Sequence, residues 1–160
     1  MRARLFTAAI LPLLLTATPA VSAQDSAEVT RQPASERSPD RKAPLRMVYH
    51  VGDDVHQAAR VAANIRNQLR LDSDIGIAVV AIGPGIDFLI EGAEDANGNP
   101  FDATIEDLTA QGVKFLICGT TMTSRGIDPD EILPEATIVT SGMNEIARLQ
   151  LREGYAYIRP

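Results

Sequence analysis

The sequence predicts a single α/β domain in which a mostly parallel, five-stranded sheet lies between two layers of helices. Short apolar runs alternate with helix-like segments over residues 45–160. Such alternation is typical of a parallel sheet with right-handed crossovers. The near-continuous apolar run at residues 75–82 fits a central strand covered on both faces. About 115 residues are enough for one core, so we expect a three-layer α/β/α architecture.

The first strand and the first helix follow each other closely. Residues 47–51 are rich in β-formers, and Asp53 and Asp54 come next as candidate N-caps for a helix over residues 55–71. Five apolar side chains of this helix share one face at helical spacing. They are Val55, Ala58, Ala62, Ile65 and Leu69. We expect this face to pack against the sheet.

The second strand, residues 75–82, stops at Gly83-Pro84-Gly85, and a short apolar segment follows at residues 86–90. The glycines suggest a phosphate-binding loop, but the segment lacks both the Lys-Ser/Thr ending and the longer glycine fingerprint of such loops. A tight turn into a helix is therefore the favoured interpretation.

The next helix is predicted to begin beside a proline. Asn97-Gly98 is typical of a turn, and Asn99 and Pro100 have the character of an N-cap and a first helical residue. The buried stripe of this helix is expected to contain Phe101, Ile105 and Leu108, with Gly112 as the stop.

The C-terminal part supplies three further strands. Residues 113–118 form the third predicted strand, which ends on Cys118 and leads into a polar, helix-like segment at residues 120–125. A short helix is predicted at residues 130–133, and strands at residues 136–140 and 155–158. The last helix is expected to begin at Ser141-Gly142 and to bury Met143, Ile146 and Ala147.

The N-terminal region predicts export. Two arginines precede an apolar core at residues 5–15, and a small-x-small pattern ends at Ala23, so residues 1–23 are predicted to be a cleaved signal peptide. The apolar core is shorter than the ~20 residues that span a bilayer, and we expect no membrane insertion after cleavage. Residues 24–44 are predicted to be a disordered leader, because they contain almost no large apolar residue. The mature protein would be periplasmic in a Gram-negative cell.

Charge and composition exclude several classes of function. The net charge is −6, and it becomes −8 when the two arginines of the predicted signal are removed. The chain has no basic stripe with interleaved aromatic residues and no tryptophan, so nucleic acid is not an expected partner. No spaced cluster of His, Cys and acidic residues predicts a metal site, and Asp53 and Asp54 are better read as helix caps. We expect no metal and no cofactor.

The candidate binding and catalytic residues lie where the predicted strands end. In parallel α/β sheets, ligands bind in the crevice outside the carboxyl ends of the strands. The residues predicted for a binding site there are Gly83, Pro84, Gly85, Gly119, Thr120, Ser141 and Gly142. The sequence pairs no histidine with Ser124 or Ser141 in a recognisable motif, so a serine hydrolase has little support.

Cys118 is the single cysteine of the chain. In an exported protein, a lone thiol serves as a buried apolar filler, as an intermolecular link or as a reactive group. Its place between a strand and a helix-like segment brings it near unpaired amide hydrogens, which favour the thiolate. Such a position lowers a thiol pKa from about 8.5 to 7 or below. Both a buried filler and a reactive thiol fit this pattern.

Five segments together resemble the DsrE/DsrF-like proteins. They are residues 47–51 (MVYHV), 82–85 (IGPG), 95–101 (DANGNPF), Cys118 with 124–127 (SRGI), and 153–158 (EGYAYI). The resemblance covers residues 45–160 and implies a three-layer α/β/α domain in homo- or hetero-oligomers, such as trimers or hexamers. It also implies sulfur relay as a persulfide on one cysteine, whose position Cys118 matches. The familiar sulfur-relay members are cytoplasmic, whereas this chain carries a predicted signal.

The resemblance and the thiol chemistry together suggest one mechanism. The Cys118 thiolate attacks a sulfane sulfur donor, carries the sulfur as a persulfide and passes it to a partner thiol. Backbone amides after Gly119 would stabilise the anionic sulfur, Arg125 would add positive charge if the chain turns back, and His50 would exchange a proton. The alternatives are an oligomeric module that binds a small ligand or a partner without catalysis, and a thiol redox sensor.

Overall fold

The structure, a computed structural model, describes residues 44–160. The predicted signal peptide at residues 1–23 and the predicted leader at residues 24–44, except for Pro44, lie outside the described residues.

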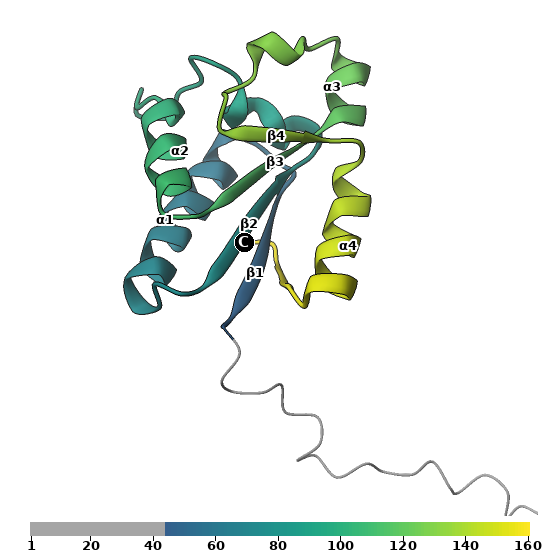
Figure 1. The fold of residues 1–160 in the computed structure, drawn as a ribbon. Helices are drawn as coiled ribbons and strands as arrows, with labels where there is room; N and C mark the ends of the chain where they lie inside the picture. Colours follow the sequence, from purple (N-terminus) through teal and green to yellow (C-terminus); the bar gives the residue numbers. More distant parts are fainter. Residues whose placement is uncertain (1–43) are drawn as a thin grey trace, which may run out of the picture. The chain divides into compact units, whose positions relative to one another are not determined.

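Five parallel strands form one sheet in the order β4-β3-β2-β1-β5 (Figure 1). The strands are β1 (Arg46–Val51), β2 (Gly76–Ala81), β3 (Lys114–Cys118), β4 (Ala136–Val139) and β5 (Ala156–Ile158). All four neighbouring pairs run parallel. The predicted fold class is confirmed, and the strand order, which the sequence did not reveal, places β2 between the strands that carry His50 and Cys118.

Helices cover both faces of the sheet. Figure 1 shows α1 (Val55–Leu71) and α2 (Phe101–Ala110) on one side and α4 (Gly142–Glu153) on the other. The 3-10 helix η2 (Gly83–Leu89) packs with α1 and α2, and its Phe88 ring stacks edge-on against Phe101 and Phe115 in the larger core. The smaller core lies under α4, where Ile146 and Leu149 meet Val80 and Leu116. Helix α4 also connects β4 at one edge of the sheet to β5 at the other.

Helix α1 begins as predicted, but its buried face contains a polar residue. The Asp54 side chain accepts a hydrogen bond from the Gln57 backbone at 2.9 Å, which satisfies one free amide of the first turn. The Gln57 side chain is fully buried, and its carbonyl accepts the backbone N–H groups of Gly52 and Asp53, each at 2.9 Å. Its amide donates to the Pro160 carbonyl at 3.1 Å. Gln57 therefore ties the end of β1 to the C-terminus.

The start of α2 lies one residue later than predicted. Pro100 is the N-cap and not the first helical residue, and it provides no side-chain cap. Asn99 was expected to cap the helix, but its backbone and side-chain N–H groups donate to the Asp95 carboxylate, which also accepts the Asn97 amide. Asp95 therefore holds Asn99 in the preceding turn, where Gly98 has a φ of 78°.

Two further expectations near the C-terminus need correction. The short helix predicted at residues 130–133 is the 3-10 helix η3 (Pro129–Glu131), and Ile132 and Leu133 lie after it and are buried. Met143 and Ala147 were predicted to be buried, but both are exposed, Met143 at 60%. The reason is that α4 faces the sheet through Gly142, Ile146 and Leu149.

None of the helices in residues 44–160 combines the length and the apolar character needed to cross a membrane.

Candidate functional site

Cys118 lies where β3 meets α3 (Gly119–Arg125), and it is the N-cap residue of that helix. Its Cβ faces Gly142 at the start of α4, and only 2% of the residue is exposed. Because β4 pairs with β3 through Val139 and Cys118, the chain that leaves β4 turns directly over the end of β3. The predicted residues Gly119, Thr120, Ser141 and Gly142 therefore lie around the sulfur.

Backbone and side-chain groups form hydrogen bonds with the sulfur of Cys118. The Gly142 backbone N–H donates to Sγ at 3.2 Å, and the Thr120 hydroxyl lies 3.0 Å from Sγ. Gly142 is the first residue of the twelve-residue helix α4, whose N-cap Ser141 accepts a hydrogen bond from the Asn144 amide. The amide that reaches the sulfur thus belongs to the positive end of a helix dipole.

The surroundings of the sulfur favour the thiolate. Burial alone would raise the pKa of the Cys118 thiol, because it penalises the charged form. Hydrogen bonds from the hydroxyls of Thr120 and Thr121 and from the amides of Gly142 and Thr121 outweigh burial and lower the pKa from 9.0 to about 7. A substantial thiolate fraction is therefore present at neutral pH.

A pocket of about 510 Å³ lies on the solvent side of this site. Its lining residues are Gly119, Thr120, Thr123, Ser124 and Thr140, none of which is charged. Thr120 is exposed and also bonds the sulfur, so its side chain separates the buried thiol from the pocket. We therefore expect a reagent in the pocket to reach Sγ when the Thr120 side chain moves aside.

The predicted Gly83-Pro84-Gly85 turn joins the site through one residue. The Thr121 hydroxyl accepts the Gly83 backbone N–H at 3.1 Å, and it also contributes to the environment of the Cys118 sulfur. Pro84 lines a second pocket of about 420 Å³, together with Gly83 and Thr121. Gly85 is buried against the end of β1.

Arg125 lies at the end of α3 opposite Cys118, and its guanidinium contacts Asp87 and Gly83. The guanidinium forms an ion pair with Asp87 at 2.6 Å and donates to the Gly83 carbonyl at 3.3 Å. It lines the second pocket and makes no hydrogen bond to Cys118 in the described part of the chain. Arg125 therefore fixes α3 to the Gly83 turn.

His50 is remote from the thiol. It lies on β1, two strands from β3, a lateral separation of about 10 Å. Its Nδ1 and the Tyr157 hydroxyl are 2.8 Å apart. Burial lowers the pKa of His50, and Arg159 lowers it further, while Asp53 opposes both. The structure therefore places His50 outside contact with Cys118, because β2 lies between the two strands.

The sequence did not reveal the role of Thr121, nor that the helix whose positive end faces the sulfur is α4. We expected amides after Gly119 to stabilise the sulfur, and the Thr121 amide does so, but the Gly142 amide of α4 contributes as well. The available signal was the consecutive threonines after Cys118-Gly119, together with the Ser141 cap. Within residues 44–160, no three His, Cys, Asp or Glu side chains cluster in a way that would hold a metal ion.

The thiol pKa gives the first testable prediction. The rate of Cys118 alkylation should rise with pH and level off above a midpoint near 7, because the thiolate is the reactive form. Replacing Thr120 with valine keeps the side-chain shape but removes the hydroxyl, so we expect the midpoint to rise by about one unit. Thr123→Val, in the same pocket, is the matched control. An unchanged midpoint in Thr120→Val would contradict a role for this hydroxyl.

Comparisons with known proteins support this fold. The model of the DsrE/DsrF-like family matches residues 48–160. A solved structure from Methanobacterium thermoautotrophicum, the MTH1491 protein of unknown function, is 33% identical with a TM-score of 0.64, over 72% of this chain and 99% of that one.

The ychN protein from E. coli has a TM-score of 0.59 at 18% identity, with the same coverage, and supports the fold. No curated protein matches the chain significantly. The match over most of the chain, beginning inside β1 and including Cys118, shows that the chain belongs to the DsrE/DsrF-like family.

Proposed function

We propose that this protein carries sulfane sulfur as a persulfide on Cys118 and passes it to an acceptor thiol. The observation that carries the proposal is the Gly142 amide aimed at Sγ from the start of α4, at 3.2 Å. This amide and the hydroxyl groups beside it hold the thiol pKa at about 7 despite burial. A cysteine that served only as apolar filler would not need these donors.

The transfer balances without an oxidant. The Cys118 thiolate attacks the outer sulfur of a donor persulfide or of thiosulfate, a new S–S bond forms, and the donor leaves as a thiolate or as sulfite. The acceptor thiolate then attacks the outer sulfur held on Cys118, which restores the Cys118 thiolate. The Gly142 amide is placed to stabilise the anionic sulfur at both ends of the cycle.

Access to the sulfur is the step that the structure restricts. Cys118 is 2% exposed, and the Thr120 side chain lies between it and the uncharged pocket. Thr120 is the first full side chain of α3 and is itself exposed. A rotation of this side chain is therefore the smallest movement that would admit a donor.

Intact-mass measurement tests the proposal. The protein is incubated with glutathione persulfide or with thiosulfate, and we expect a gain of one sulfur atom that a reducing thiol removes. Cys118→Ser should show no gain. Because Cys118 is the single cysteine, any gain in Cys118→Ser would mean adventitious sulfur. The absence of a gain in the native protein across neutral pH would sink the sulfur-carrier proposal.

The burial of Cys118 favours a second candidate function, that of a binding module. A module that binds a ligand or partner without chemistry would use the 510 Å³ pocket and keep Cys118 as packing. That candidate predicts no sulfur adduct on the native protein and an unchanged oligomer in Cys118→Ser. A redox sensor would instead react with peroxide to form a sulfenic acid, which the same mass measurement distinguishes.

We also propose export and self-association. The predicted cleavage after Ala23 supports a periplasmic mature protein in a Gram-negative cell, and the N-terminal sequence of the mature chain would test it. Ile138 on the edge strand β4 is 44% exposed, and Met143 and Leu151 on α4 are 60% and 86% exposed. These apolar side chains support self-association as a homo-oligomer. The family resemblance implies a trimer or a hexamer, and light scattering would give its mass.

A further inference from the structure

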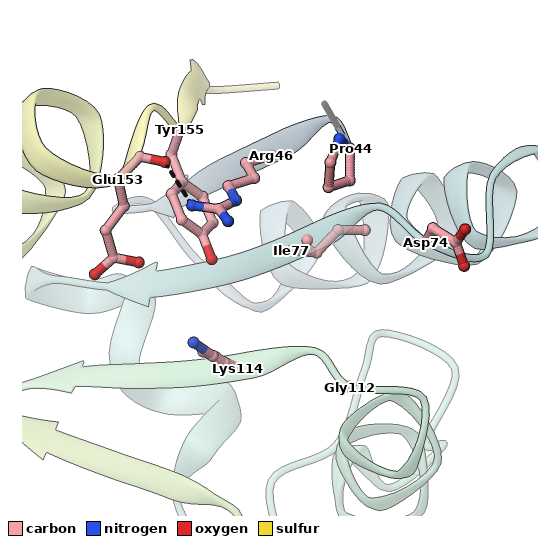
Figure 2. A pocket seen from close by; sticks show the side chains of 9 residues that line it. Pro44, Arg46, Asp74, Ile77, Gly112, Lys114, Glu153 and Tyr155 are labelled. Carbon is pink, nitrogen blue, oxygen red and sulfur yellow. Dashed lines mark hydrogen bonds between the residues drawn. The ribbon is translucent and has the colours of Figure 1, made fainter. Parts of the chain in front are cut away.

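A third pocket lies at the opposite end of the sheet from Cys118 (Figure 2). It has a volume of about 290 Å³ and lies at the amino ends of β1, β2 and β3. Lys114 opens β3 and Cys118 closes it, so the pocket lies about 13 Å from the thiol along the strand. The proposed sulfur chemistry does not use this pocket.

The strand register explains why the pocket exists. Arg46 on β1 pairs with Gly76 on β2, and Ala78, two residues further, pairs with Lys114 on β3. Side chains alternate along strands, so Arg46 and Lys114 project from the same face on either side of Gly76. Gly76 has no side chain, and a Cβ there would lie 3.3 Å from Arg46 Cγ. The missing side chain leaves a hollow between the two cations.

Tyr155 closes the hollow from above. Only 7% of this residue is exposed, and Figure 2 shows its hydroxyl directed between Arg46 and Lys114, over β2. The hydroxyl lies close to Gly76, where an added Cβ would be 3.7 Å from it. Within residues 44–160 this hydroxyl makes no hydrogen bond. It faces the pocket, so it is free to donate to an oxygen atom of a bound ligand.

The cations of the pocket are available to a ligand. The described residues contain no carboxylate at ion-pair distance from Arg46 or Lys114. The Arg46 guanidinium uses one N–H for the Glu153 backbone carbonyl, at 3.0 Å, which leaves its other donors free. This hydrogen bond is the dashed line in Figure 2.

Three acidic side chains of residues 44–160 lie near the pocket, and none of them pairs with its two cations. The Glu153 carboxylate also lines the pocket, but it is ion-paired with Arg148. Asp74 lies at the far end of the pocket from Tyr155 (Figure 2). Glu145 also interacts with Lys114 through charge, but its carboxylate is ion-paired with Arg148 as well. These acids weaken the positive charge of the pocket, yet none of them occupies the donors of Lys114 or the remaining donors of Arg46.

We propose that this pocket binds a small oxyanion, with one carboxylate, phosphate or sulfate group held between Arg46, Lys114 and the Tyr155 hydroxyl. Guanidinium groups bind such anions through paired N–H donors, and the lysine adds a point charge. The volume admits only a small metabolite. The site is independent of Cys118, so it is expected to persist in Cys118→Ser.

Calorimetric titration of the full chain tests the proposal. Succinate, inorganic phosphate and sulfate are added separately, with the ionic strength held constant by chloride. We expect saturable binding of one anion per chain by at least one of the three. The preferred anion then distinguishes a carboxylate ligand from a phosphate or sulfate group.

Four variants locate the site. Lys114→Gln and Arg46→Gln should each weaken binding about tenfold, and Tyr155→Phe should weaken it several-fold. Glu153→Gln removes a nearby negative charge and should tighten binding. Arg60→Gln, with the same loss of charge on the exposed face of α1, should bind like the native chain.

Two results would overturn the proposal. One is the absence of saturable binding by all three anions. The other is a native affinity in Lys114→Gln or in Tyr155→Phe, which would show that the anion binds elsewhere.

Discussion

Replacing Gly85 with alanine is expected to lower the free energy of unfolding by about 3 kcal/mol. An alanine Cβ at this position would lie 2.4 Å from the Val51 carbonyl oxygen, 2.5 Å from its carbon and 2.7 Å from the Gly52 nitrogen. All three are backbone atoms at the end of β1, so no side-chain rotation relieves the overlap. The η2 turn must move away from the sheet, and it carries Ile86, Phe88 and Leu89 of the core with it.

Chemical denaturation measures this loss, and Gly92→Ala is the matched control. Gly92 has a positive φ of 75° with nothing within 4 Å of the added Cβ, so alanine there costs about 1 kcal/mol through backbone conformation alone. Gly85 does not have a positive φ, and its cost comes from contact. If Gly85→Ala were no less stable than Gly92→Ala, the close approach of η2 to β1 would be wrong.

The alternation of strands and helices was predictable because its signals are local. The apolar run of β2 and the Asp54 cap depend on residues adjacent in sequence. The strand order β4-β3-β2-β1-β5 depends on which strand each connection places next to which, and no single segment encodes that. That order decides the site, because it brings α4 beside Cys118 and separates His50 from it.

The buried face of α4 shows the limit of periodicity. Met143 and Ala147 fit a helical stripe with Ile146, and so do Gly142 and Leu149. The structure selects the second stripe, because Gly142 lets the start of the helix approach Ile82 and Cys118 closely. The choice of face is therefore a consequence of one tertiary contact.

The contact between Gly142 and Cys118 also controls the thiol. Among substitutions that keep Cys118, we expect Gly142→Ala to have the largest effect on the thiol pKa. In Gly142→Ala, the new Cβ would lie 2.6 Å from Ile82 Cγ1 and 3.2 Å from Cys118 Cβ. The Ile82 side chain can rotate, but the Cys118 Cβ is fixed to the sheet, so the start of α4 must withdraw. The hydrogen bond from residue 142 to Sγ, now 3.2 Å, then lengthens or breaks.

We expect the pKa of Cys118 to rise in Gly142→Ala from about 7 toward its ordinary value of 9.0. A rise of one unit would lower the thiolate fraction at neutral pH about fivefold, and sulfur loading and alkylation should slow in proportion. Stability should also fall, by about 2 kcal/mol. Titration of the thiol absorbance and intact-mass kinetics provide the two readouts.

Gly154→Ala separates these effects, because Gly154 caps the other end of α4. It has a φ of 71° and open space around its Cβ position, so alanine there should cost about 1 kcal/mol of stability and leave the thiol pKa unchanged. The double variant Ile82→Ala, Gly142→Ala removes the closest contact but keeps the one with the Cys118 Cβ, so its thiol pKa should stay raised. If the thiol pKa stays near 7 in Gly142→Ala, or rises equally in Gly154→Ala, the helix end does not stabilise the thiolate. The sulfur-carrier proposal would then lose its supporting observation.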